Sequence, residues 1–327
     1  MIEAFNVSKH YTLKEKKSWF RYETKTLEAV KELNLRIDKG EIIGLLGLNG
    51  AGKTTTIKML STLLKPTSGM IIVDGVDIES NPMEVKKKVN MIAGGERMLY
   101  WRLTGFENLM YFGKLYGLTG VMLKNRCENL LENMGLADAA HIPVERYSKG
   151  MKQRLQIARG LINDPSYLFL DEPTLGLDAP VAKHLRKSVK ELAHQQGKGI
   201  LLTSHYLEEV EELCDKVYII DQGRLVLEDT PRKIVETFVK EFRVTVEVQN
   251  ASIAQMEFVQ RRMQDKGASF VSTEAAGGYV FEVISPFDAT PLAASACFEM
   301  GLEVQRLETK KPRLEDAIIQ MSEGLSA

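Results

Sequence analysis

The sequence contains one glycine-rich segment, residues 47–54 (GLNGAGKT), that strongly restricts what this 327-residue chain can fold into. The segment has the complete spacing G-x-x-x-x-G-K-[ST], follows the apolar residues 42–46 and precedes a helical pattern, which is the context that this motif requires. Its glycines let backbone N–H groups curl around phosphates at the N-terminus of a helix. The sequence therefore predicts the strand, loop and helix that open an α/β nucleotide-binding fold.

The side chains of this loop have predictable roles. Lys53 can reach the terminal phosphates of ATP, and the hydroxyl of Thr54 can bind Mg²⁺. The context makes a glycine turn with an incidental lysine the weaker interpretation. The predicted ATP-binding residues of the loop are Gly47, Leu48, Asn49, Gly50, Ala51, Gly52, Lys53, Thr54 and Thr55.

Two adjacent carboxylates, Asp171 and Glu172, follow the apolar residues 167–170. An open α/β sheet binds its ligand at the carboxyl ends of its strands, which is where this pair is expected. Asp171 can hold the shell of a Mg²⁺ ion through water, and Glu172 can polarise an attacking water. Taken alone, the pair would be interpreted as a solvated acidic turn, but the phosphate-binding loop favours a catalytic role.

Three further motifs carry a resemblance to one family. Residues 147–155 (YSKGMKQRL) resemble the signature motif of ATP-binding cassette (ABC) proteins, usually LSGGQ. Asp178, after DEPTLGL, resembles the aspartate of the family's D-loop, and His205, after ILLTS, resembles its switch histidine. The ordered set spans about the first 235 residues, and several motifs in order are far more specific than one. The chain is therefore similar to ATP-binding subunits of ABC transporters, with a signature motif close to that of bacterial exporters.

The resemblance implies that two cassettes pair head to tail, so that each ATP lies between the phosphate-binding loop of one subunit and the signature of the other. The signature residues that would act in trans are Ser148, Lys149, Gly150 and Met151. Ser148 is a good helix N-cap, and the N–H groups that follow it form an anion site. Lys149 could add charge at the phosphate or be a solvated first-turn lysine. By the same resemblance, Asp178 helps align the ATP site of the facing subunit, and His205 contacts the γ-phosphate and positions the water. Without the other motifs, His205 would be interpreted as a packed or surface residue.

One segment departs from the family's pattern, and one matching residue has a competing interpretation. The family's glutamine after the strand read as VNMIA is absent, and this chain has GGER at residues 94–97. Gly95 takes the expected position, and Glu96 is the candidate substitute metal ligand beside Thr54 and Asp171. Tyr11 matches the family's adenine-stacking aromatic, with core packing as the competing interpretation.

The order of the remaining patterns predicts two domains. Residues 1–236 are expected to form an α/β P-loop domain of the ABC ATPase type, with a mixed sheet core and a helical signature subdomain at about residues 98–163. Residues 240–327 read as β-α-β-β-α-β, which predicts a small α+β ferredoxin-like domain. Within it, Thr290 and Pro291 are expected to be the N-cap and first residue of a helix, and the aromatic residues of 278–281 are expected in the core.

The composition of the chain and its lack of targeting signals limit the kinds of partner and compartment that the sequence predicts. Lys plus Arg number 43 and Asp plus Glu 44, so no global basic field indicates a nucleic-acid partner. Three distant cysteines indicate reduced thiols, and neither a signal peptide nor a spanning apolar run of about 20 residues is present. Residues 14–25 combine basic and aromatic residues; they could touch anionic headgroups or a permease, although a solvated hairpin is favoured.

These expectations together describe an ATPase that powers transport through a separate membrane permease. It would use ATP and Mg²⁺, act as a homodimer or with a second cassette, and lie peripherally at the cytoplasmic face of the membrane. The C-terminal residues 311–317 resemble the tail of drug- and polysaccharide-exporter cassettes, which favours export. The alternative is a soluble cassette ATPase acting on ribosomes or DNA. Such proteins generally carry two cassettes or a long coiled coil, whereas this sequence has a single P-loop and no sustained heptads.

Overall fold

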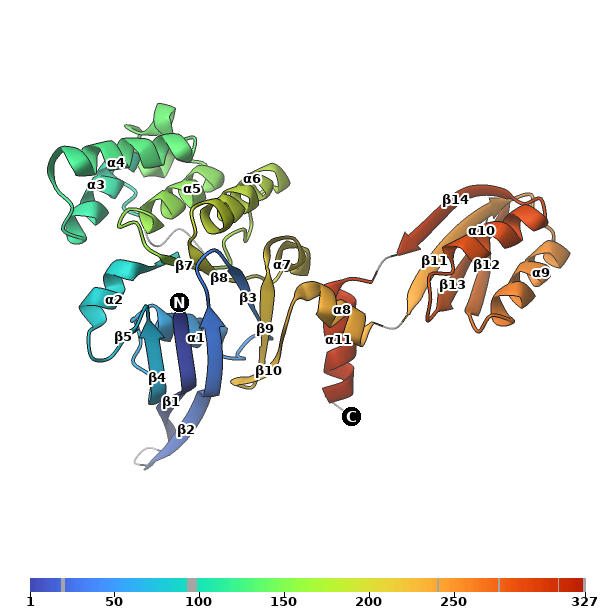
Figure 1. Cartoon of the computed structure of the whole chain (residues 1–327), viewed down its shortest axis with the longest axis horizontal. Helices are drawn as coiled ribbons and strands as arrows, with labels where there is room; N and C mark the ends of the chain where they lie inside the picture. Colours follow the sequence, from blue (N-terminus) through green and yellow to red (C-terminus); the bar gives the residue numbers. More distant parts are fainter. Residues whose placement is uncertain (19–20, 93–98, 240, 276, 311, 326–327) are drawn as a thin grey trace. The chain divides into compact units, whose positions relative to one another are not determined.

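The computed structural model describes residues 1–18, 21–92, 99–239, 241–275, 277–310 and 312–325, without the side chains of 14–18, 21–24 and 322–325. Its residues form two compact units, Met1–Pro231 and Arg232–Ala327 (Figure 1). Among the helices of these ranges, none combines the length and the apolar character needed to cross a bilayer.

A six-stranded sheet forms the centre of the first unit. Its strand order is β10-β9-β3-β8-β7-β6, and all neighbours are parallel except β9 and β10. The central strands are apolar and buried from end to end, as strands covered on both faces must be. The predicted mixed α/β core is therefore confirmed. The strands are β3 (Ile42–Leu46), β6 (Val89–Ile92), β7 (Tyr167–Asp171), β8 (Gly199–Thr203), β9 (Lys216–Asp221) and β10 (Arg224–Asp229).

A second, antiparallel sheet has the order β2-β1-β4-β5. Side chains of this sheet, of the central sheet and of α1 form one hydrophobic core. The helix α1 therefore packs against both sheets. The strands of this sheet are β1 (Ile2–Ser18), β2 (Arg21–Ile37), β4 (Ser68–Val73) and β5 (Val76–Asp77). The helices of the core region are α1 (Lys53–Leu60), α2 (Pro82–Lys88), α6 (Ala179–Lys190) and α7 (Leu207–Leu213). A π-helix, η4 (Glu191–Gln195), continues α6.

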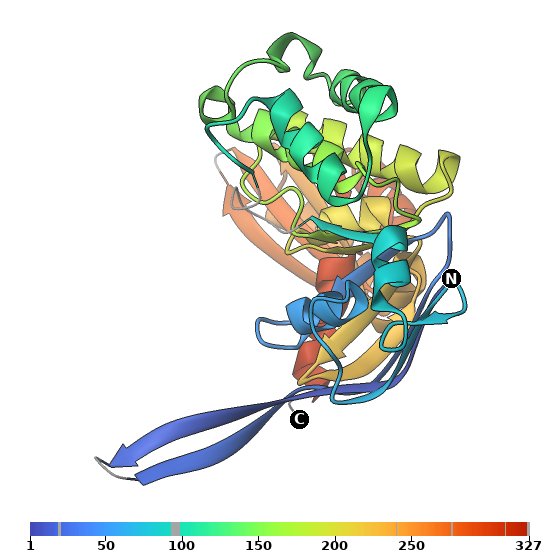
Figure 2. The ribbon, with the colours of Figure 1, turned by 90° about the vertical axis from the view of Figure 1, so that its left-hand side faces the viewer.

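The strands β1 and β2 form a long hairpin. Their backbones pair from Ile2↔Ile37 to Ser18↔Arg21, and Figure 2 shows the paired strands running out from the body of the unit as an arm. The hairpin predicted for residues 14–25 is therefore present in the backbone. Its contact with solvent, lipid or permease stays a prediction, because most of its side chains lie outside the described part.

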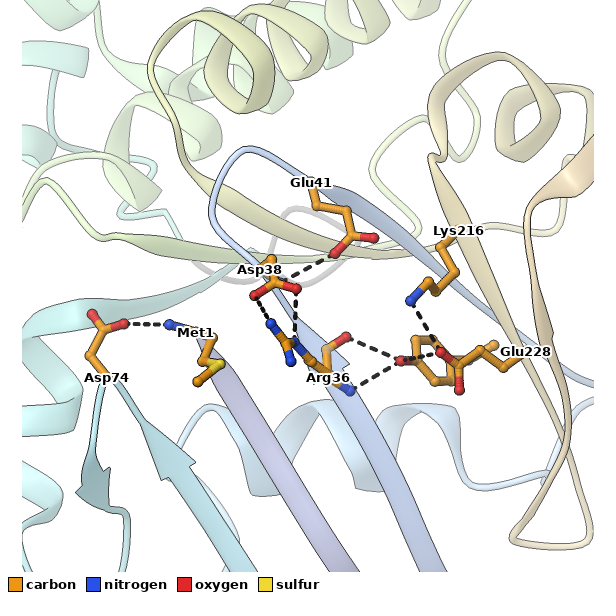
Figure 3. Close-up of polar contacts among 8 residues, drawn as sticks. Met1, Arg36, Asp38, Glu41, Asp74, Lys216 and Glu228 are labelled. Carbon is orange, nitrogen blue, oxygen red and sulfur yellow. Dashed lines mark hydrogen bonds and ion pairs between the residues drawn. The ribbon is translucent and has the colours of Figure 1, made fainter.

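Polar contacts join the base of β2 to β9 and β10 (Figure 3). The hydroxyl of Tyr218 donates to the carbonyl oxygen of Arg36 (3.2 Å) and to Glu228 (3.1 Å), and it accepts from the Arg36 N–H (3.1 Å). The Arg36 guanidinium makes a two-pronged contact with Asp38 at 2.9 and 3.0 Å, and Lys216 donates to Glu228 at 3.1 Å. These bonds satisfy the buried phenol at the junction of the two sheets.

Helices fill the segment between β6 and β7, as predicted for the signature subdomain. They are α3 (Gly105–Leu115), α4 (Gly120–Asn133) and α5 (Lys149–Gly160), with two short 3₁₀ turns, η2 (Ala137–Ala139) and η3 (Val144–Arg146). Thr104 and Glu107 form a capping box that starts α3. Tyr147, directly before the signature serine, is buried and donates to the carbonyl oxygen of Ala139 at 2.6 Å.

The second unit has the predicted β-α-β-β-α-β order, with an antiparallel sheet of order β12-β13-β11-β14. Phe281 is buried and lies 5.1 Å from Phe270 between ring centroids, which confirms a core role for this aromatic. The prediction that Thr290 is an N-cap is wrong: Ala289 is the N-cap and Thr290 is already helical. The elements are α8 (Pro231–Phe238), β11 (Phe242–Gln249), α9 (Ile253–Gln264), β12 (Ser269–Ala275), β13 (Gly278–Ser285), α10 (Thr290–Glu299), β14 (Glu303–Lys310) and α11 (Leu314–Leu325).

Candidate functional site

Three loops that carry predicted site residues leave the same edge of the central sheet. The strands β3, β8 and β7 are direct neighbours and run parallel, so their carboxyl ends lie side by side. The glycine-rich loop follows β3, His205 follows β8, and Glu172 follows β7. The strand β8, which precedes His205, therefore lies between β3, which precedes the glycine-rich loop, and β7, which precedes Glu172.

The glycine-rich loop has a backbone that side chains would obstruct. Gly47, Gly50 and Gly52 have φ values of 153°, 85° and 108°. A Cβ on Gly47 would lie 2.2 Å from the carbonyl oxygen of Ile220, and one on Gly52 would lie 2.5 Å from that of Ala29. Since Gly52 is the N-cap of α1 and offers no side-chain cap, the first N–H groups of this helix are left for an anionic ligand.

Lys53 links this loop to the carboxylates. Its side chain is largely buried, and its ammonium donates to the carbonyl oxygens of Gly47 (2.5 Å) and Leu48 (3.1 Å). Burial lowers the pKa of Lys53, and the negative charges of Glu172 and Asp171 oppose that shift. The lysine and both carboxylates therefore act on one another electrostatically, within a single site.

Glu172 and His205 are in direct contact, with Oε1 of the glutamate 2.7 Å from Nε2 of the histidine. Glu172 has a φ of 51°, which is unusual for a residue with a side chain, and its N–H donates to both the carbonyl and hydroxyl oxygens of Thr203 at 3.1 Å. The Thr203 hydroxyl in turn donates to Asp171 at 2.7 Å. The end of β8 therefore fixes both carboxylate residues, while the Glu172 and His205 side chains remain partly exposed to a reactant.

The signature residues form a second cluster with the loop after β7. Ser148 is the N-cap of α5, as predicted, and its hydroxyl accepts from the Met151 N–H at 3.2 Å. Gly150 packs against Val181 of α6, where an added Cβ would lie 3.0 Å from a methyl carbon. The ammonium of Lys149 lies over Gly176, only 2.1 Å from where a Cβ would be, so this lysine contacts the predicted D-loop of its own subunit. Asp178, the N-cap of α6, is exposed and makes no side-chain cap bond.

Two predicted residues have a less defined place. Tyr11 pairs with Leu27 across the hairpin, two residues before Ala29, whose carbonyl oxygen lies against Gly52. The stacking role of Tyr11 stays a prediction. Glu96 and its neighbours at 94–97 lie outside the described residues.

The oxygen donors suit Mg²⁺ that is shared with substrate. Thr54 is exposed at the start of α1, and one oxygen of Asp171 is free of the bond from Thr203. Within the described ranges, no group of three His, Cys, Asp or Glu side chains could hold a metal by itself. Mg²⁺ is commonly bound by one or two protein oxygens together with substrate phosphates and water, and Thr54 and Asp171 fit that arrangement.

Sequence reasoning missed one acidic residue that is hydrogen-bonded to the loops after β7 and β8. Glu209 is 3% exposed, and its Oε2 accepts from the hydroxyls of Thr174 (2.8 Å) and Ser204 (2.6 Å). Burial raises the pKa of Glu209, and the two hydroxyl bonds oppose the shift. The sequence did offer one indication of this residue: Glu209 lies on the same face of α7 as the buried apolar residues Val210 and Leu213.

Comparisons with known proteins agree with this geometry. The sequence profile of the family described as ABC transporter matches residues 30–175. The chain is 43% identical over 218 residues to the ABC transporter ATP-binding protein NatA of Bacillus subtilis (strain 168), covering 67% of this chain and 88% of that protein. It is 35% identical over 295 residues to the daunorubicin resistance ATP-binding protein DrrA2 of Streptomyces coeruleorubidus, covering 90% of each.

Two solved structures share the fold. One is described as the ATP-binding subunit of an ABC transporter; it has a TM-score of 0.60 and 30% identity, and the match covers 73% of this chain and 93% of that one. The other is a dimeric ATP-binding cassette in a post-hydrolysis state with ADP and Pi, with a TM-score of 0.61, 24% identity and coverage of 70% and 98%. The predicted fold class is therefore confirmed.

Proposed function

Because this chain belongs to the ABC transporter family, as an ATP-binding and ATP-hydrolysing subunit, we propose that it powers an exporter of drug-like compounds through a separate membrane permease. One structural observation carries the ATPase part: Lys53, Asp171, Glu172 and His205 meet at one sheet edge beside a loop shaped for phosphates. The export part rests on the likeness to DrrA2 over 90% of both chains. The named relatives give no support to a ribosome- or DNA-directed ATPase.

The roles of the site residues follow from their chemistry. The N–H groups of the loop and of the α1 N-terminus bind the phosphates, and Lys53 exchanges its two carbonyl partners for phosphate oxygens. Glu172 accepts a hydrogen bond from the attacking water. His205, whose Nε2 lies 2.7 Å from Glu172, contacts the γ-phosphate and positions that water. Thr54 and Asp171 would hold Mg²⁺, whose charge stabilises the phosphates.

The second half of each ATP site comes from another subunit. The exposed start of α5, capped by Ser148, presents N–H groups that suit a γ-phosphate, and Asp178 lies next to this cluster along the loop after β7. We place a second copy of the chain opposite this surface. The pair would sit at the cytoplasmic face of the membrane, bound to the permease, with no nucleic-acid partner.

Drug accumulation in cells tests the export function. The chain is produced in a drug-sensitive host together with the membrane permease that we propose as its partner, with Glu172→Gln as the matched control. We expect the wild-type pair to lower the accumulation of a daunorubicin-type fluorescent drug and Glu172→Gln to abolish that effect. Equal accumulation with both forms, despite a functional ATPase, would remove drug export and leave the ATPase assignment intact.

A further inference from the structure

A buried carboxylate is hydrogen-bonded to Thr174 and Ser204, which lie close in sequence to Glu172 and His205. Glu209, on α7, is 3% exposed, and burying an ionisable carboxyl group is costly unless its oxygens accept hydrogen bonds. One of its oxygens, Oε2, accepts two hydroxyl hydrogens, while Oε1 is buried without a hydrogen-bond partner among the described residues. A residue that only filled space here would be expected to be apolar, like its neighbours Val210 and Leu213 on the same face.

The two hydroxyl groups belong to the two segments that carry the reacting side chains. Thr174 lies in the turn that begins at Glu172, where the Leu175 N–H donates to the Glu172 carbonyl oxygen at 3.2 Å. Ser204 directly precedes His205, and its hydroxyl also accepts from the Tyr206 N–H at 3.0 Å. The single oxygen of Glu209 therefore connects the loop after β7 to the loop after β8.

This connection adds to bonds that act from the strand side. Thr203 holds the Glu172 backbone and the Asp171 carboxylate, so the strand ends are already joined. Those bonds act at the strand ends, and none of them reaches Thr174 or Ser204. Glu209 adds a connection farther along the two loops, because Thr174 and Ser204 donate to its Oε2 atom at 2.8 and 2.6 Å.

We propose that Glu209 is a positioning residue for ATP hydrolysis: its Oε2 holds the Glu172 loop and the His205 loop together, so that the two side chains keep their contact around the attacking water. The proposal rests on the proposed catalytic roles of Glu172 and His205. Glu209 is buried, and its hydrogen bonds among the described residues go to Thr174 and Ser204 and not to the phosphate-binding loop. Its loss should therefore lower kcat and leave ATP affinity unchanged.

The test compares purified full-length variants in steady-state ATPase and ATP-binding assays. Glu209→Ala removes the acceptor, and Glu209→Gln keeps one side-chain oxygen that can accept both hydroxyls. Glu208→Ala is the matched control, because it removes an exposed carboxylate from the adjacent position of the same helix. Thr174→Val and Ser204→Ala remove one donor each.

We expect Glu209→Ala to lose about 10- to 100-fold in kcat, as a small misplacement of catalytic groups does, with the ATP Kd within about twofold of wild type. Glu209→Gln should recover most of kcat. Thr174→Val should lower kcat in the wild-type background and change it little in Glu209→Ala, because the shared interaction is already gone.

Several results would overturn the proposal. A kcat for Glu209→Ala equal to that of Glu208→Ala would remove any positioning role. Parallel losses in kcat, ATP affinity and melting temperature would show a general structural role, and additive effects of Thr174→Val and Glu209→Ala would show that the two side chains act independently. Glu172→Gln in the same assays separates the two levels: an active Glu172→Gln removes the proposed catalytic site, whereas an inactive Glu172→Gln with an active Glu209→Ala removes only this inference.

Discussion

The Nε2 atom of His205 lies 2.7 Å from the Oε1 atom of Glu172, although the two residues follow different strands of the central sheet. A contact of this length joins the group proposed to activate water to the group proposed to orient it. The relationship depends on β7 and β8 being parallel neighbours, since only then do both loops begin at the same edge.

Glu172→Gln keeps the size and hydrogen bonding of the side chain and removes the base. We expect kcat for ATP hydrolysis to fall about 10²- to 10⁴-fold while ATP affinity survives and a closed dimer accumulates. The measurements are phosphate release and size-exclusion chromatography with ATP. Wild-type turnover would exclude Glu172 as the base.

Lys53→Ala removes the ammonium that we propose binds the terminal phosphates. We expect ATP binding to weaken by about 10- to 100-fold, as the loss of a charge-assisted hydrogen bond does, and hydrolysis to fall further. Titration with a fluorescent ATP analogue measures the affinity. Lys198→Ala is an informative control, because that lysine is also buried but pairs with Asp164 away from the loop; equal ATP affinity in both variants would contradict the role of Lys53.

Composite sites predict an asymmetry between mixed and uniform dimers. Ser148→Arg forfeits the cap of α5 and fills the expected phosphate position, so it should damage the ATP site of the other subunit. Mixed dimers of Ser148→Arg and Lys53→Ala would damage one shared site and leave the other complete. In the Glu172→Gln background, mixed dimers should trap ATP at one site and Ser148→Arg homodimers should trap almost none, as measured by nucleotide bound per isolated dimer. Parental levels of trapping in those homodimers would exclude the signature helix from the site.

Gly50 and Gly52 form a matched pair for testing the loop backbone. Both have φ in the left-handed region, but an added Cβ meets nothing within 4 Å at Gly50 and lies 2.5 Å from the Ala29 carbonyl oxygen at Gly52. Gly50→Ala should cost about 1–2 kcal/mol for the backbone conformation alone. Gly52→Ala should cost more and abolish ATP binding, because the loop must shift away from β2. Denaturant unfolding and ATP titration measure both effects, and equal costs would contradict the close approach of the loop to β2.

Glu209 should make stability depend on pH. Since burial raises its pKa, the folded protein binds a proton on this group more readily than the unfolded chain does. The resulting stabilisation is fully present below the unfolded pKa and is lost as pH rises through the folded pKa. Glutamine does not titrate, so the melting temperature of Glu209→Gln minus that of wild type should increase as pH rises above the pKa that glutamate has in the unfolded chain. Thermal unfolding at a series of rising pH values measures it, with Glu208→Gln as the control; a difference that falls with pH would contradict the direction of the shift.

Local patterns predicted the parts of the molecule whose structure is decided locally. The glycine spacing with Lys53 indicated the loop, and Ser148 before a helical pattern indicated the N-cap that the structure contains. The error at Thr290 arose because Pro in the first turn fixes only an approximate start, and the Asp288 carboxylate accepts from the Thr290 N–H instead.

The parts of the site that depend on distant contacts could not be predicted. Glu209 meets Thr174 and Ser204 only after β7, β8 and α7 have packed, and no sequence spacing records that meeting. The contact of Lys149 with Gly176 likewise joins the start of α5 to the loop after β7 through tertiary structure. The roles of Tyr11 and Glu96 stay predictions.

The length of the hairpin formed by β1 and β2 can change without changing the residues of the proposed catalytic site. Side chains alternate between the two faces of a strand, so adding two residues to each strand preserves every face and register, whereas adding one exchanges the faces beyond the insertion. Because the strands pair, with several register shifts, out to Ser18 and Arg21, lengthening or shortening at the far end leaves the Gly52 contact with Ala29 in place. Related chains could thus differ in reach by steps of about 6–7 Å per pair of added residues in each strand while retaining the same catalytic centre.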